Sequence, residues 1–177
     1  PMTDALTTLG HEAEGRFEEK KSVFIAHACP VLDEAEAQAY IKRMKSEYAD
    51  ARHNVWGYRM AGDIAVRCSD DGEPQGSAGV PTLDVLRKSG VSNAVIVTTR
   101  YFGGILLGAG GLVRAYSRAA HDALAAAGIV QMRTCKTAVV RCDYAQYSTV
   151  ARALAQAEAA VDRTDFLQEV SIAFHLP

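Results

Sequence analysis

The stretch AVIVTTRYFGGILLGAGGLVRAYSRAAHDALAAAG, residues 94–128, carries the clearest strand and helix signals of the chain. Residues 94–99 are an apolar, β-branched run, which predicts a buried strand. Five glycines then crowd a loop, and residues 112–127 are rich in alanine and stop at Gly128, which favours a helix closed by a glycine. A strand, a glycine-rich loop and a helix in this order indicate an α/β domain.

The segments before this stretch extend the same pattern. Residues 21–31 predict a strand, and Asp33 with Glu36 forms a capping box that predicts the start of a helix. Residues 55–60 and 64–68 predict a β-hairpin, residues 70–81 a loop, and residues 82–88 a short helix capped by Thr82. We therefore expect one α/β domain over residues 2–130.

The pattern changes after residue 134. Residues 137–142 predict a strand, Asp143 with Gln146 predicts a helix cap, and residues 161–166 and 170–176 predict two further strands. This β-α-β-β order is the beginning of a ferredoxin-like β-α-β-β-α-β fold, which needs another helix and strand. We expect an α+β protein whose ferredoxin-like domain, residues 134–177, is truncated.

Composition narrows the class of protein. Of 177 residues, 49% are hydrophobic and 23% are charged, which is typical of a folded globular protein and excludes a disordered chain. No window has the length and apolarity of a membrane span, and the acidic N-terminus is unlike a signal peptide, so a cytoplasmic location is expected. The four cysteines form no C-x-x-C pair, and we expect neither a metal nor another cofactor.

Charge is unevenly distributed along the chain. Residues 85–142 contain eight bases and a single acid, Asp122, whereas the segments on both sides are acidic. Such a basic segment indicates an anionic partner, such as RNA, a phosphate or an acidic protein surface. The alternative is that these bases pair with acids of the flanking segments in the folded protein.

The glycine-rich loop is the best candidate for an anion site. Glycine amides before a helix can gather an anion, and nearby arginines can add charge-assisted hydrogen bonds. The candidate residues are Arg100, Gly103, Gly104, Gly108, Gly110, Gly111, Arg114 and Arg118. The segment matches neither the P-loop nor the dinucleotide fingerprint, so ATP and NAD chemistry are not expected. Glycines that merely permit a tight bend and close helix packing are the alternative interpretation.

A second candidate group combines the acidic loop with a histidine. Asp70, Asp71 and Glu73 lie within four residues, and His53 and Asn54 begin a predicted strand. These five residues are expected to form a partner-recognition surface, with an acidic turn and a structural histidine as the plainer alternatives. The segment around Ser77 lacks the first glycine of a G-x-S-x-G nucleophile elbow, which argues against a hydrolase.

Three stretches carry a family resemblance. They are His53-Asn54 with Trp56, the segment DDGEPQGSAGVP at 70–81, and RYFGG at 100–104 with LGAGGLVRAY at 107–116. Together they closely resemble the IMPACT/YigZ family over residues 17–127, with Ser77 where the family commonly has threonine. The resemblance implies a bacterial YigZ-like protein with two domains. The first would have a two-layer α/β fold like a ribosomal-protein domain and domain IV of elongation factor G, and the second a ferredoxin-like fold.

The resemblance also implies a class of function. Eukaryotic relatives regulate translation under amino-acid starvation by competing for the activator of a kinase that bacteria lack. A non-enzymatic regulatory or binding module is therefore expected, linked to translation and stress response, whose basic loop contacts RNA or a ribosome-associated protein. The alternative is a small enzyme that uses Asp70, Asp71, Glu73 and His53 on a phosphorylated or peptide substrate, provided that these side chains meet in one pocket.

Overall fold

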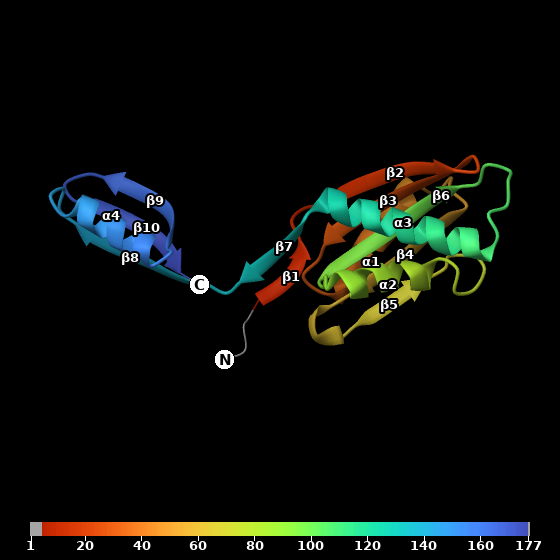
Figure 1. The fold of residues 1–177 in the computed structure, drawn as a ribbon, viewed down its shortest axis with the longest axis horizontal. Coiled ribbons are helices and arrows are strands. Elements are labelled where there is room, and N and C mark those ends of the chain that lie inside the picture. The colour runs from red at the N-terminus through yellow and green to blue at the C-terminus, as the bar shows by residue number, and fades with distance from the viewer. Residues whose placement is uncertain (1–4, 177) are drawn as a thin grey trace. The chain divides into compact units, whose positions relative to one another are not determined.

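The computed structural model describes residues 5–176, which divide into two compact units. Residues 6–132 form the N-terminal unit, and Ala5 with residues 133–176 forms the C-terminal unit. Both combine helices with β-sheet, so the mixed α/β class expected from the sequence is confirmed (Figure 1). Within the described residues, no helix combines the length and the apolar character that a membrane span requires.

A five-stranded antiparallel sheet organises the N-terminal unit. Its strand order is β2-β3-β6-β4-β5, and a separate two-stranded sheet joins β1 to β7. The strands of these two sheets are β1 (Ala5–Leu9), β2 (Ala13–Glu19), β3 (Ser22–Pro30), β4 (His53–Arg59), β5 (Val66–Ser69), β6 (Ala94–Tyr101) and β7 (Ile129–Arg133). The predicted strand at residues 94–99 is thus the central strand of the larger sheet, which explains its unbroken apolar run.

Helices cover both faces of this sheet. The helices are α1 (Glu34–Glu47), α2 (Gly79–Ser89) and α3 (Ala109–Ala127). Val95 and Val97 of β6 pack in one core with α1, whereas Ala94 and Ile96 pack with α2 and α3 in another. Because successive side chains of a strand point to opposite faces, α1 lies on the face opposite the other two helices. Helices and apolar cores therefore lie on both faces of the large sheet.

Helix starts show where local signals suffice and where they do not. The carboxylate of Asp33 accepts a hydrogen bond from the Glu36 amide at 2.8 Å, as the capping box predicts for α1. In contrast, α2 begins at Gly79, three residues before the expected cap. Thr82 is buried and its hydroxyl donates to the Ala78 carbonyl, so it lies inside the helix and caps nothing. The real cap of α2 comes from the loop before it, as shown below.

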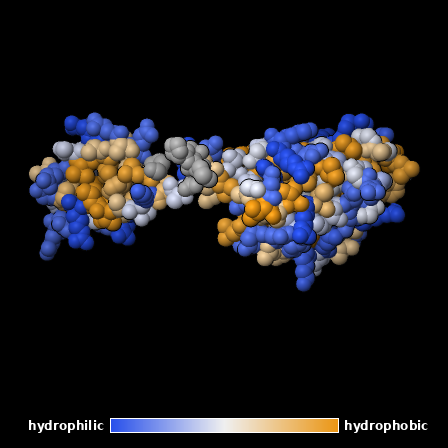
Figure 2. All heavy atoms as spheres, turned by 90° about the horizontal axis from the view of Figure 1, so that it is seen from below, coloured by the Kyte–Doolittle hydropathy of each residue, from blue (hydrophilic) through white to orange (hydrophobic). Residues whose placement is uncertain are grey.

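The C-terminal unit has the predicted β-α-β-β order. It contains β8 (Lys136–Cys142), α4 (Tyr147–Gln156), β9 (Ala160–Phe166) and β10 (Val170–Leu176), with an antiparallel sheet of order β8-β10-β9. Asp143 and Gln146 exchange hydrogen bonds at the start of α4. A small core gathers around Val170 and Ile172. Several large apolar side chains of the unit stay exposed, and apolar surface is visible in Figure 2; they are Val139, Tyr144, Val161, Phe166 and Leu167.

Candidate functional site

Strand pairing brings together two residues that the sequence separates. His53, the first residue of β4, pairs across the sheet with Arg100 near the end of β6. Cross-strand partners project from the same face, so both side chains emerge on the side that α3 covers. Tyr116 of α3 lies over the same region and is completely buried, with its ring in edge-to-face contact with Phe24. The sheet and α3 thus enclose a polar site.

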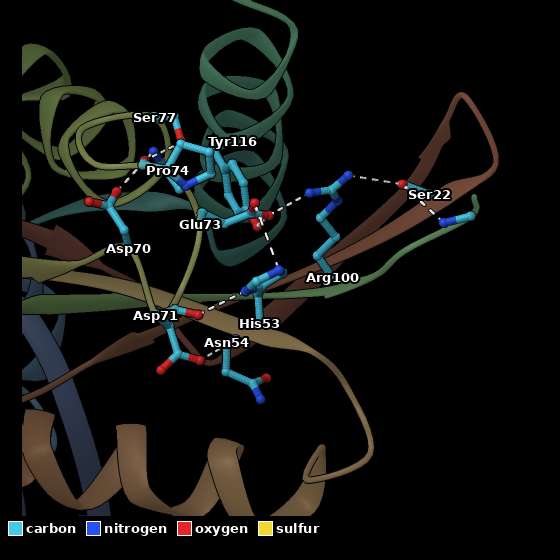
Figure 3. Close-up of polar contacts among 12 residues, drawn as sticks. Ser22, His53, Asn54, Asp70, Asp71, Glu73, Pro74, Ser77, Arg100 and Tyr116 are labelled. Carbon is cyan, nitrogen blue, oxygen red and sulfur yellow. Dashed lines mark hydrogen bonds and ion pairs between the residues drawn. The ribbon is translucent and has the colours of Figure 1, made fainter. Parts of the chain in front are cut away.

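The carboxylate of Glu73 lies at the centre of this site (Figure 3). Its Oε1 accepts hydrogen bonds from Nη1 of Arg100 at 2.6 Å and from the hydroxyl of Tyr116 at 2.7 Å. Its Oε2 lies 3.8 Å from Nε2 of His53. The side chains of Glu73 and Arg100 are only 3% and 5% exposed. We call Glu73, Arg100, Tyr116 and His53 the Glu73 network.

Further contacts hold the network in one geometry. Nη2 of Arg100 donates to the hydroxyl of Ser22 at 3.2 Å, and that hydroxyl also accepts from the Gly103 amide. Burial, followed by the hydrogen bond to Glu73, raises the pKa of Tyr116 far above its ordinary value. Tyr116 therefore remains protonated and serves as a permanent donor. The network has the character of a rigid, charge-balanced structural element.

His53 is oriented by the acidic loop. Its Nδ1 lies 2.8 Å from the carbonyl oxygen of Asp71, and because a carbonyl can only accept, Nδ1 carries the proton. Nε2 is thereby directed towards Glu73. Gly72 lies close beside the ring, since a Cβ atom there would be 3.4 Å from Nδ1. The loop and the histidine consequently define each other's position.

Asp70 caps α2 from outside the helix. Its Oδ1 accepts from the amides of Ala78 and Gly79 at 3.1 and 2.8 Å, and its Oδ2 accepts from the Gly76 amide at 2.9 Å. A carboxylate in this position satisfies otherwise unpaired amides and interacts favourably with the helix dipole. Asp70 is therefore a helix cap that the sequence pattern did not indicate.

Replacing Asp70 by alanine is expected to lower the free energy of unfolding by about 2 kcal/mol, the upper range for loss of a helix cap, because three backbone amides lose their acceptor. Asp84→Ala is the matched control, since this carboxylate lies on α2 itself and makes only a 3.9 Å ion pair with Arg87. Urea unfolding of both variants checks the prediction. Equal loss in the two variants would contradict the capping role.

Asp71 and Asn54 are also structural. The carboxylate of Asp71 pairs with Nζ of Lys45 at 2.5 Å and accepts from the backbone amide of Asn54 at 2.7 Å. The Asn54 side chain is buried and bonds to the Tyr48 carbonyl and the Thr99 hydroxyl. These groups therefore brace the start of β4. The five residues expected to form a recognition surface are largely internal, because Asn54 and Glu73 are buried and both aspartates are engaged by the fold.

Neither Ser77 nor a cluster of metal-binding side chains adds chemistry to this site in the described part of the chain. Ser77 is buried, and its hydroxyl donates to the Pro74 carbonyl at 2.6 Å, which leaves it unsuited to attack a substrate. Within residues 5–176, no three His, Cys, Asp or Glu side chains gather in a way that could hold a metal ion. The acids of this loop instead bind the protein itself: Asp70 accepts from backbone amides, and Asp71 and Glu73 pair with Lys45 and Arg100.

Most of the glycine-rich loop is exposed to solvent, whereas Arg100 is buried. Gly104, Gly108 and Gly110 are exposed, as the anion-site interpretation requires, and Gly103 and Gly111 are half-buried. Arg100 is buried beneath the loop and paired with Glu73. Arg100 therefore does not share the exposed surface of Arg114 and Arg118, and it supports the loop through Ser22 and Gly103.

Arg114 and Arg118 do share an exposed face of α3, next to a groove of about 200 Å³. The turn between β2 and β3 adds Lys20 to the same groove, against a single acid, Glu19. Arg118 lies over the ring of Phe17 at 4.2 Å and makes a long, 3.6 Å ion pair with Asp122. Among the described residues, Arg114 makes no ion pair. We call the surface of Lys20, Arg114 and Arg118 the basic groove; sequence spacing alone missed Lys20.

Comparison with known proteins agrees with these motifs. Residues 20–124 match the model of the Impact N-terminal domain. The chain is 39% identical over 144 residues to IMPACT family member YvyE of Bacillus subtilis, covering 81% of this chain and 66% of that protein. It is 34% identical over 161 residues to IMPACT family member YigZ of Escherichia coli, covering 89% of this chain and 79% of that protein.

A solved structure has the same fold. It is a crystal structure described only as that of a hypothetical protein, and it superposes with a TM-score of 0.70 at 31% sequence identity. The match covers 99% of this chain and 87% of the other. The matched domain contains the Glu73 network, the glycine-rich loop and the basic groove. On these grounds the chain belongs to the IMPACT family.

Proposed function

We propose that this protein is a non-enzymatic binding module linked to translation, and that it contacts a translation-associated protein through the basic groove and the glycine-rich loop. The link to translation is supported by membership of the IMPACT family, since the resemblance to that family implies a regulator of translation. A regulatory role in the stress response, in the cytoplasm, belongs to the same proposal. The main observation in favour of this contact surface is the basic groove, where three bases and one acid lie beside exposed glycines.

Apolar exposure on the glycine-rich loop and at the start of α3 favours a protein partner over RNA. Ile105 and Val113 are 43% and 39% exposed, and Leu106 is 80% exposed. Protein interfaces combine such apolar side chains with arginine, whereas nucleic-acid surfaces add stacking aromatics and phosphate contacts. The partner surface is therefore expected to be acidic with apolar residues, and RNA is the alternative outcome of the test.

The geometry supports an enzyme less well. Of the four residues that would have to converge, only His53 and Glu73 line a common cavity. Asp70 and Asp71 are engaged by backbone amides and Lys45. Glu73 is itself held by Arg100 and Tyr116 in a closed set of hydrogen bonds. None of these three carboxylates is therefore placed as a free general base.

The test is capture from bacterial lysate by the wild-type protein and by the variant Arg114→Glu with Arg118→Glu. Capture of translation-associated proteins is expected to survive nuclease treatment and to fall about tenfold in the variant, because like charges then face the acidic partner. Arg87→Glu with Lys88→Glu is the matched control, since these exposed bases end α2 and line no part of the groove.

Two results would overturn the proposal. Capture that is unchanged in the groove variant would show that the groove is not the contact surface. Capture that disappears with nuclease, together with direct binding of labelled RNA that weakens steeply with salt, would replace the protein partner by RNA.

A further inference from the structure

A second concave site lies on the other side of the glycine-rich loop from the basic groove. It is a cavity of about 410 Å³ between the acidic loop and the start of α3, and Leu107 separates it from the groove by lining both. Small-molecule sites usually begin at roughly 300 Å³, so this cavity can enclose a compact ligand of about one amino-acid residue. Its walls are mostly apolar, and they include Pro74, Phe102, Leu106, Leu107 and Leu112.

The polar side of the cavity carries a small excess of positive charge. Arg100, Glu73 and His53 of the Glu73 network line it, and Arg52 lines it as an exposed side chain. Glu73 neutralises Arg100, which leaves the charge of Arg52 unbalanced within the lining. In addition, the Arg100 side chain is only 5% exposed, and its Nε has no hydrogen-bond partner among the described residues. A single negative charge on a ligand would complement this lining.

The start of α3 adds hydrogen-bond donors at the same place. Gly108 and Ala109 line the cavity, and Gly108 supplies no side chain to cap the helix. The first amides of a helix have no intrahelical acceptor and attract negative charge. Gly108 has a φ of 74°, which a side chain would oppose, and nothing lies within 4 Å of its missing Cβ. The backbone is thus open to a ligand at this point.

We propose that this cavity binds a monocarboxylate with a branched apolar body, either as a free molecule or as the C-terminal residue of a polypeptide. The carboxylate lies at the start of α3 beside Arg52, and the apolar body contacts Leu106, Leu107 and Leu112. This inference goes beyond the proposed partner contact and does not depend on it, because the basic groove is lined by different charged residues.

The test is titration of the protein with isocaproate, followed by the backbone amide resonances of Gly108, Gly110 and Gly111. Saturable shifts are expected with a dissociation constant on the order of 1 mM, as suits so small a ligand. Isocaproamide, which has the same shape without the charge, is expected to cause no saturable shift. A short peptide ending in leucine, with a free or an amidated terminus, distinguishes a polypeptide source from a free molecule.

Variants separate this site from the groove. Arg52→Gln is expected to weaken isocaproate binding about threefold, as loss of one exposed charge pair should, while Arg87→Gln leaves it unchanged. The groove variant Arg114→Glu with Arg118→Glu is expected to retain isocaproate binding even where partner capture is lost. The inference is overturned if isocaproate causes no saturable shift, if isocaproamide binds equally, or if isoamyl phosphate binds more tightly than isocaproate.

Discussion

Replacing Glu73 by glutamine is expected to lower the free energy of unfolding of the N-terminal unit by about 3–5 kcal/mol, the cost of leaving one member of a buried ion pair uncompensated. Arg100 would keep its charge at 5% exposure without its carboxylate partner. The chain has a single tryptophan, Trp56 of β4 in this unit, so urea unfolding followed by its fluorescence reports on the relevant part of the chain.

Two controls make this prediction specific. Glu12→Gln removes the carboxylate of the exposed pair with Arg43 and is expected to cost less than about 1 kcal/mol. Removing both buried charges, in Glu73→Gln with Arg100→Met, is expected to restore about half of the lost stability, because no buried charge is then unpaired. A double variant less stable than Glu73→Gln alone would contradict the ion-pair explanation.

Replacing Gly103 by alanine is expected to cost about 3 kcal/mol, the upper range for forcing a side chain into a packed site. A Cβ atom at this position would lie 1.9 Å from the carbonyl oxygen of Lys21, and backbone cannot move aside as a flexible side chain can. The turn between β2 and β3 would have to separate from the glycine-rich loop. The same fluorescence-monitored urea unfolding measures the loss.

Gly104→Ala is the matched control on the neighbouring residue. Gly104 has a φ of 89°, but nothing lies within 4 Å of its missing Cβ. Alanine there is expected to cost only about 1–2 kcal/mol of backbone strain. If Gly104→Ala proved as costly as Gly103→Ala, the close approach of Gly103 to Lys21 would not account for a special cost at that position.

The candidate site contains features that the sequence pattern predicts and features that it does not. The glycine-rich loop between a strand and a helix was predictable, because apolar β-branched runs, alanine-rich helices and glycine loops are local signals. The roles of Arg100 and Asp70 were not. Arg100 reads as a surface base of a basic segment, yet it pairs with a glutamate 27 residues away, and Asp70 reads as part of an acidic turn, yet it caps a helix that starts nine residues later.

Strands β2 and β7 were not predicted from the sequence, for a related reason. Strand β7 is exposed along its whole length, and β2 has no fully buried residue, so neither has the apolar alternation that marks a strand in the sequence. They form because β2 pairs with β3 and β7 with β1. A strand stabilised mainly by backbone pairing cannot be recognised from its own side chains.

Sequence alone therefore determined the order of most helices and strands, the mixed α/β class and the kinship of the chain, since each depends on short-range propensity or on contiguous motifs. Only the tertiary structure decided that helices cover both faces of the large sheet, that Lys20 joins Arg114 and Arg118, and that Glu73 is buried against Arg100. Alternation along a strand shows which side chains share a face, but strand pairing and helix packing decide what meets them there. Those partners are distant in the chain, and no local pattern encodes them.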